Sequence, residues 1–137
     1  MASVILPQNI SKNRIFSNIP RESNLSGTNY AVNVAGTSAV SPSQKQFALI
    51  TSVIVTNKTL RSIPLFAKVT NDVDGTSAFL LYGVNLPPGV AFEVIQGNKF
   101  ILKENDKLFL YHTDISDNVM DAVVSYVVHV PEAEYTV

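Results

Sequence analysis

The chain has 137 residues, of which 46% are apolar and 15% are charged, and its formal net charge is −1. This length suits a single domain, and the lack of a basic excess argues against binding to nucleic-acid phosphates. There is no cysteine, which excludes disulfides, thiolate catalysis and cysteine-based zinc sites. Because the usual charged share is about 25%, we expect another surface to cover part of the exterior.

The first residues, Met-Ala-Ser-Val-Ile-Leu-Pro, predict no targeting to a membrane or to secretion. They lack the basic start and the long apolar run of a signal peptide, and Ala2 stands where myristoylation requires glycine. No stretch approaches the roughly 18 consecutive apolar residues of a membrane span. The absence of cysteine favours folding in a reducing cytoplasm. We therefore expect no membrane partner.

Residues 1–44 differ in composition from the rest of the chain. They are rich in Ser, Asn, Thr and Gly, and no charged residue stands between Ser23 and Gln44. Alternating apolar residues over 30–34 predict a short strand. Two interpretations are open: an extended N-terminal arm that becomes ordered on a neighbouring surface, or an ordinary first strand with a mobile leader.

Residues 45–131 are expected to form one sandwich domain, followed by a short tail, 132–137. Apolar alternation between turn residues predicts seven strands, over 47–55, 63–70, 78–86, 90–94, 99–102, 108–111 and 121–130. Both alternations of 47–55 are apolar, which predicts a central strand covered on both sides. In 78–86, one face is expected to hold Leu80, Tyr82, Val84 and Leu86.

Short strands, regular turns and the absence of a helical period indicate an all-β fold. The type expected is an antiparallel β-sandwich, either a jelly roll or immunoglobulin-like, with residues 1–44 as its arm.

The titratable residues offer no strong metal site. His112 and His129 each lie at the end of a predicted strand without a second histidine at ligand spacing, so a surface or subunit-contact role is expected. Asp72, Asp74 and Gly75 faintly resemble a calcium loop. They lack the third acidic ligand and the closing Glu, so a β-turn is expected instead.

Enzyme activity has no support in the motifs. Asp114, Asp117 and Asp121 cluster near one loop, but carboxylate-based glycoside hydrolysis needs a cleft with aromatic platforms, and the chain has no Trp. There is no phosphate-binding glycine loop, Gly-x-Ser-x-Gly elbow or zinc-protease helix. We expect a non-enzymatic protein without catalytic residues, metal or cofactor.

Five segments carry a resemblance to a known group of proteins: 48–57 (ALITSVIVTN), 63–70 (IPLFAKVT), 86–90 (LPPGV), 99–108 (KFILKENDKL) and 123–128 (VVSYVV). In this order they resemble small structural proteins in the virions of tailed bacteriophages, including phages of cyanobacteria and other marine bacteria. The resemblance covers about two-thirds of the chain and contains no catalytic signature. The arm 1–44 and the loop 114–121 are longer than compact members of the group need.

The resemblance implies a small β-sandwich on the virion, assembled in the host cytoplasm. A capsid cement or decoration protein is the first expectation, and a neck or tail component is the alternative. The expected partners are copies of itself, as trimers, and major capsid or other virion proteins. The interface is expected in the arm, at Ile15, Phe16, Ile19, Leu25, Tyr30, Val32 and Val34.

A second hypothesis is a carbohydrate- or receptor-binding sandwich. Such a module needs exposed aromatic side chains on one face or loop, and the sequence offers Tyr82, Tyr111 and Tyr126.

Overall fold

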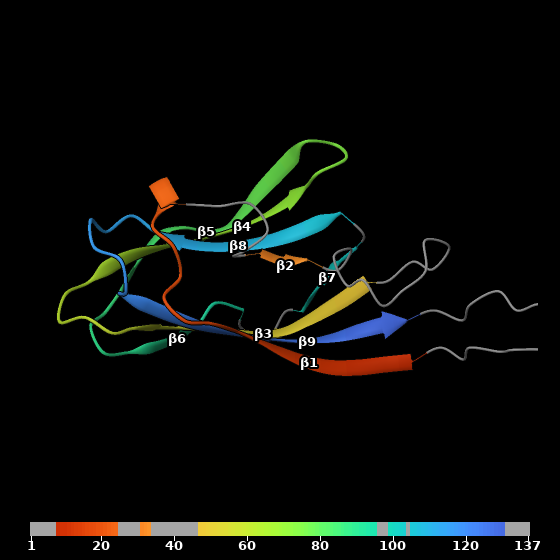
Figure 1. Ribbon diagram of the computed structural model, residues 1–137, viewed down its shortest axis with the longest axis horizontal. Coiled ribbons are helices and arrows are strands. Elements are labelled where there is room, and N and C mark those ends of the chain that lie inside the picture. Colours follow the sequence, from red (N-terminus) through yellow and green to blue (C-terminus); the bar gives the residue numbers. More distant parts are fainter. Residues whose placement is uncertain (1–7, 25–30, 34–46, 96–98, 104, 131–137) are drawn as a thin grey trace, which may run out of the picture.

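A computed structural model describes residues 8–24, 31–33, 47–95, 99–103 and 105–130 of the chain. These residues form two antiparallel sheets that pack face to face (Figure 1), so the predicted β-sandwich is confirmed. Sheet A holds β1 (Gln8–Phe16), β9 (Met120–Val130) and β3 (Phe47–Asn57), with β6 (Ala91–Glu93) and β7 (Phe100–Leu102) along the other side of β3. Sheet B holds β2 (Ala31–Asn33), β8 (Asp106–His112), β4 (Ile63–Asn71) and β5 (Thr76–Leu86). A single 3-10 turn, Glu22–Asn24, is the helical element of the described part.

The strand pairings are nested, like one long hairpin folded over on itself. β1 pairs with β9, β2 with β8, β3 with β6 and β7, and β4 with β5, all antiparallel. Pairing of β3 with β9 and of β4 with β8 completes the two sheets. This nesting is that of a jelly roll, which decides between the two sandwich types expected. All seven strands predicted beyond residue 45 are present.

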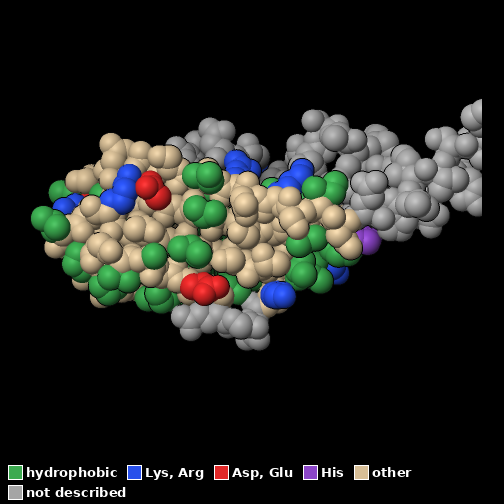
Figure 2. Space-filling view, turned by 90° about the horizontal axis from the view of Figure 1, so that it is seen from below, with side chains coloured by type: hydrophobic (Ala, Val, Ile, Leu, Met, Phe, Trp, Pro, Cys, Tyr) green, Lys and Arg blue, Asp and Glu red, His purple; other side chains and the backbone are tan. Residues whose placement is uncertain are grey.

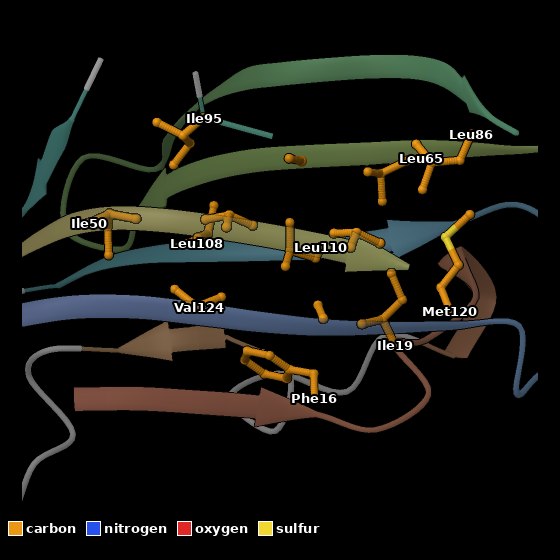
Figure 3. Packing of buried hydrophobic residues seen from close by; sticks show 14 of the residues in the cluster. Phe16, Ile19, Ile50, Leu65, Leu86, Ile95, Leu108, Leu110, Met120 and Val124 are labelled. Carbon is orange, nitrogen blue, oxygen red and sulfur yellow. The ribbon is translucent and has the colours of Figure 1, made fainter. Parts of the chain in front are cut away.

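The core lies between the sheets and is built from side chains at inward, alternating positions. Figure 3 shows Ile50 and Val124 of sheet A in one buried cluster with Leu65 and Leu108 of sheet B. Burying each such aliphatic side chain stabilises the fold by about 1.5–3 kcal/mol.

A β-bulge in β3 explains why both of its alternations are apolar. Ala48 and Ile50 point into the core before the bulge, and Val53 and Val55 do so after it. The register with β9 shifts between Ile50 and Ser52, so Thr51 is the extra residue. Within the chain, the expectation that β3 is covered on both sides is therefore wrong. One face is buried, and apolar residues remain on the other.

Where the structure describes residues 1–44, they belong to the sandwich. β1 pairs along its whole length with β9, and β2 pairs with β8. Phe16 and Ile19 are buried in the core (Figure 3). The expected boundary between arm and sandwich at residues 44 and 45 is corrected accordingly, because strands from both sides of it share the same sheets.

Asn57 is a buried polar residue that joins the end of β3 to residues 59–61 and 86–89 at one end of the sandwich. Its Nδ2 donates to the carbonyls of Arg61 at 2.8 Å and Leu86 at 3.0 Å. Its Oδ1 accepts from the backbone N–H of Thr59 at 2.9 Å. Its backbone carbonyl accepts from Gly89, which stands at φ 69°, a conformation that favours glycine. Buried polar groups stabilise a fold when they are satisfied in this way.

His112 is the second buried polar residue, which corrects the expectation of a surface or contact role. The backbone N–H of Asp114 donates to its Nδ1 at 3.1 Å, so the neutral ring carries its proton on Nε2. Burial lowers the pKa of His112. The negative charges of Asp114 and Asp117 oppose this shift, and the positive charge of Arg21 adds to it.

We predict that Asn57→Ala lowers the free energy of unfolding by at least about 2 kcal/mol, because it leaves buried carbonyl and N–H groups without partners. Urea unfolding measures the change. Asn85→Ala, at an exposed position of β5, is the matched control and should stay within about 0.5 kcal/mol of wild type. Equal losses in the two variants would contradict the structural role of Asn57.

We predict that stability falls on acidification because His112 is neutral in the fold. The unfolded chain takes up this proton below a pKa of about 6.5, whereas the folded chain does so only at lower pH. The stability that neutral His112 contributes is therefore complete above a pH of about 6.5. Below that pH the free energy of unfolding falls by up to about 1.4 kcal/mol per pH unit. Urea unfolding between about pH 5 and 7.5 should show a steeper pH dependence for wild type than for His112→Gln. Parallel curves would disprove the assignment.

Candidate functional site

The outer face of sheet A carries no Asp, Glu, Lys or Arg over a large area of three paired strands. Strand register sets these outward positions in rows across β1, β9 and β3. We call them the uncharged face: Asn9, Ser11, Asn13, Ile15, Val123, Ser125, Val127, His129, Phe47, Leu49, Ser52 and Ile54. The solvated face of an antiparallel sheet is ordinarily polar, so this composition indicates a surface suited to burial.

Two apolar rows cross the uncharged face. In the first apolar row, Ile15 and Ile54 both lie opposite Val123, and the three are 74%, 41% and 38% exposed, respectively. The second apolar row consists of Val127, Leu49 and, on β7, Ile101, and it ends at β1, where Ser11 lies opposite Val127. Figure 2 views the molecule from this side, and the charged side chains that it shows lie toward the margins of the hydrophobic and uncharged surface.

The row between the two apolar rows is polar, but its groups bond to one another. The Ser125 hydroxyl donates to Asn13 Oδ1 at 2.8 Å. The Thr51 hydroxyl, on the bulge, donates to the Ser125 carbonyl at 3.0 Å. Polar groups with partners of their own lose less free energy when water is removed from them. The polar row is therefore compatible with burial under a partner.

Charged groups stand at the margins of the uncharged face. Glu93 lies on the edge strand β6, and Lys99 and Lys103 flank β7. At one end of the face, Lys58 Nζ lies 3.1 Å from Asp121 Oδ1. A charge-depleted centre inside a polar rim is the usual layout of a protein–protein interface.

The outer face of sheet B carries a second feature, an aromatic cluster of Phe66, Phe79, Tyr82 and Tyr111. Phe66 stacks on Tyr111 with 5.2 Å between ring centroids. Tyr82 meets Phe66 and Phe79 edge-on, at 5.3 and 4.9 Å. Tyr82 is 74% exposed and Phe79 46%, whereas Tyr111 is buried. The cluster therefore holds its most exposed ring, Tyr82, edge-on against two others.

Two register shifts in β5 turn this cluster outward. β5 carries one extra residue on each side of the Ala67–Leu81 pair, and such bulges re-aim side chains. Gly83 lies in one of the shifts at φ 68°, and a Cβ there would lie 3.4 Å from the Phe66 ring. The expectation that Tyr82 shares a face with buried Leu86 is wrong, because Tyr82 is exposed within this cluster. Leu80 is 42% exposed and lies at the edge between the sheets, where it lines a pocket with Phe92 and Ile95.

The interface residues expected from the sequence divide into four groups. Ile15 is exposed and lies in the first apolar row. Phe16 and Ile19 are corrected, because their side chains are buried inside this chain and are not available to a partner. Val32 lies on β2. Three residues lie outside the described part of the chain: Leu25, Tyr30 and Val34.

The remaining titratable candidates take part in structural contacts. Asp72 pairs with Lys107 at 2.6 Å beside the β4–β5 turn, where Asn71 Oδ1 accepts two backbone N–H groups. The Arg61 guanidinium bonds Asp114 and lowers the pKa of its carboxyl. Among the described residues, no group of three His, Cys, Asp or Glu side chains has the geometry of a metal site. No helix there has the length and hydropathy to cross a membrane.

Comparisons with known proteins found little similarity to this chain. No family model matches the chain, and a search of curated proteins found no match. One solved chain, in a structure of infectious bursal disease virus Gx strain, is 10% identical with a TM-score of 0.46. The alignment covers 94% of this chain and 33% of the viral one, so this chain spans about a third of that length. Function is therefore inferred from the surface of this chain.

Proposed function

We propose that the chain is a non-enzymatic structural protein of a virion that docks on neighbouring subunits through the uncharged face. The observation that carries the proposal is the exposed first apolar row, together with the partly exposed second apolar row, on a sheet face whose centre has no Asp, Glu, Lys or Arg. Burying apolar surface against a partner contributes about 25 cal/mol per Å². Contiguous apolar patches on a soluble domain mark interaction sites.

Within this role, we place a capsid cement or decoration protein first. The resemblance of residues 46–130 to virion proteins of tailed bacteriophages supports this location, and repeated weak contacts over a shell add avidity. A neck or tail component is the alternative. A copy number per particle close to that of the main shell protein would indicate the capsid, whereas a far lower number would indicate the neck or tail. The trimer expected from the sequence remains a prediction.

We predict that Ile15→Lys reduces incorporation into particles at least about tenfold, because it places an unpaired charge in a contact that excludes water. Ile15 lies on an edge strand and is largely exposed, so the fold should survive. Quantitative mass spectrometry of purified particles measures incorporation.

The matched control is Leu60→Lys, in the connection between β3 and β4, where Leu60 is 99% exposed. It should be incorporated like wild type. Absence of the wild-type chain from purified particles would refute the virion role. Normal incorporation of the Ile15 variant would refute docking through this face.

The aromatic cluster favours a second function, binding of a carbohydrate receptor. Of the three tyrosines expected from the sequence, Tyr82 is exposed, Tyr111 is buried and Tyr126 is half-buried against the core. Tyr82 is held edge-on by two other rings, so stacking a sugar on it would cost little side-chain entropy. Jelly rolls include lectin domains as well as capsid domains.

If this second function holds, the purified chain binds a defined glycan on an array, and Tyr82→Ala lowers the affinity about tenfold through loss of the ring contact. Titration calorimetry with the selected glycan measures the change. Phe47→Ala removes a partly exposed ring from the opposite side of the sandwich and should leave the affinity unchanged. An array without a hit would exclude this function for the glycans it displays.

A further inference from the structure

We infer that a second copy of the same chain covers the uncharged face, related to the first by a two-fold axis that crosses the strands at Ser125. The inference rests on the docking role proposed above and specifies the partner of the same surface. It follows from four properties of the face: the spacing of its rows, the placement of its marginal charges, its composition and its area.

The rows are self-complementary. Ser125 lies opposite Asn13 on one side and Ser52 on the other, midway between the two apolar rows. The axis lies in the plane of the interface and runs perpendicular to the strands. Rotation by 180° about it reverses the direction of each strand and places that strand over the same strand of the partner. Val123 and Ile54 of the first apolar row then face Val127 and Leu49 of the partner's second apolar row, and Ile15 faces the partner's Ser11. Facing sheets pack in this way at about 30° and about 10 Å apart.

The marginal charges are complementary under the same operation. Glu93 lies opposite Ile54, at the level of the first apolar row. Ile101 lies opposite Leu49 in the second apolar row, and Lys99 and Lys103 stand on either side of it. All three charged residues are exposed. The axis brings Glu93 of one copy toward the lysines of the other, twice over, because each residue of an isologous contact is used by both copies.

The composition favours a second copy over an unrelated protein. Homodimer interfaces are more apolar than those of transient complexes, and a specific partner is commonly selected by charges that reject others. The centre of this face has no such charges. Its polar groups already bond within the chain, as Ser125 does with Asn13. The centre therefore resembles one half of a hydrophobic core, and a symmetry-related copy would supply the other half.

The area indicates a weak contact. The three strands of the uncharged face, with β6 and β7 as a fourth position beside β3, lie about 4.8 Å apart. Over seven to eight residues at about 3.4 Å each they give roughly 450 Å² per copy, or about 900 Å² in total. This is below the standard interface of about 1,600 Å² and within the class of weak complexes. Dimers should therefore form with micromolar or weaker affinity, and a concentration series is needed to detect them.

Sedimentation velocity of the purified chain from about 5 to 500 μM tests the inference. Wild type should shift from monomer toward dimer. Val123→Lys puts a lysine into the first apolar row and should raise the dissociation constant at least about tenfold. Val73→Lys, in the exposed β4–β5 turn, makes the same chemical change elsewhere and should behave like wild type. A chain that stays monomeric, forms only trimers, or dimerises regardless of Val123→Lys would overturn the inference.

Cross-linking tests the position of the axis, and the absence of native cysteine makes a single introduced thiol unambiguous. Facing sheets lie about 10 Å apart, beyond the reach of a disulfide, so a short bis-maleimide is required. Ser125→Cys should give a cross-linked dimer in high yield. Ser77→Cys, exposed on sheet B, should not. Equal yields would overturn the axis.

The two proposals can fail separately. A dimer in solution from a chain that is absent from particles would keep this inference and refute the virion role. A monomeric chain that is incorporated into particles would refute the two-fold dimer and keep the virion role. Another virion protein would then cover the uncharged face.

Discussion

The antiparallel pairing of β3 with β9 determines both surfaces of sheet A. The strands pair from Phe47 opposite His129 to Asn57 opposite Met120, interrupted only at Thr51. Because directly opposite residues point to the same side, this register collects the core residues on one face and both apolar rows on the other. A slip by one residue would exchange the two faces. The core and the docking surface are thus consequences of a single register.

The low content of charged residues is most evident on one surface of the fold. Charged side chains are depleted from the centre of the outer face of sheet A and stand at its margins (Figure 2). The opposite side of the sandwich differs, since Lys68 lies over the rings of Phe109 and Tyr111 on sheet B. One side is therefore suited to a broad, flat contact, and the other to a small ligand that meets an exposed ring.

Much of the fold can be predicted from the sequence, because strong turn signals separate the strands beyond residue 45. The turn at 71–75 and the Pro-Pro-Gly at 87–89 are examples, and the predicted strands beside them are observed. β1 is not predicted, because an edge strand buries little, and its sequence QNISKNRIF is mostly polar. The bulge at Thr51 is not predicted either, since no glycine marks it and threonine is common in any strand.

The candidate site is harder to predict than the fold. Its first apolar row joins Ile15, Val123 and Ile54 from three strands that are far apart in the sequence, and only the register shows that they are neighbours. The sequence does carry a signal, because both alternations of β3 are rich in apolar residues, and the more polar alternation of β9 still contains Val123 and Val127. That signal indicates a second apolar side of the sheet but does not specify which residues lie on it. The low charge predicts a covered surface without locating it.

The nesting of the strand pairs also orders the events by which the chain acquires its structure. β4 and β5 are joined by residues 72–75, whereas β1 and β9 bring together Gln8 and Val130, at opposite ends of the described chain. Closing the larger loop costs about 3 kcal/mol more in chain entropy. Non-local pairing of this kind slows folding. During synthesis, β1 is made before β9 and can pair with it only after β9 has been synthesised. Until then, the side chains of Phe16 and Ile19 remain exposed to water.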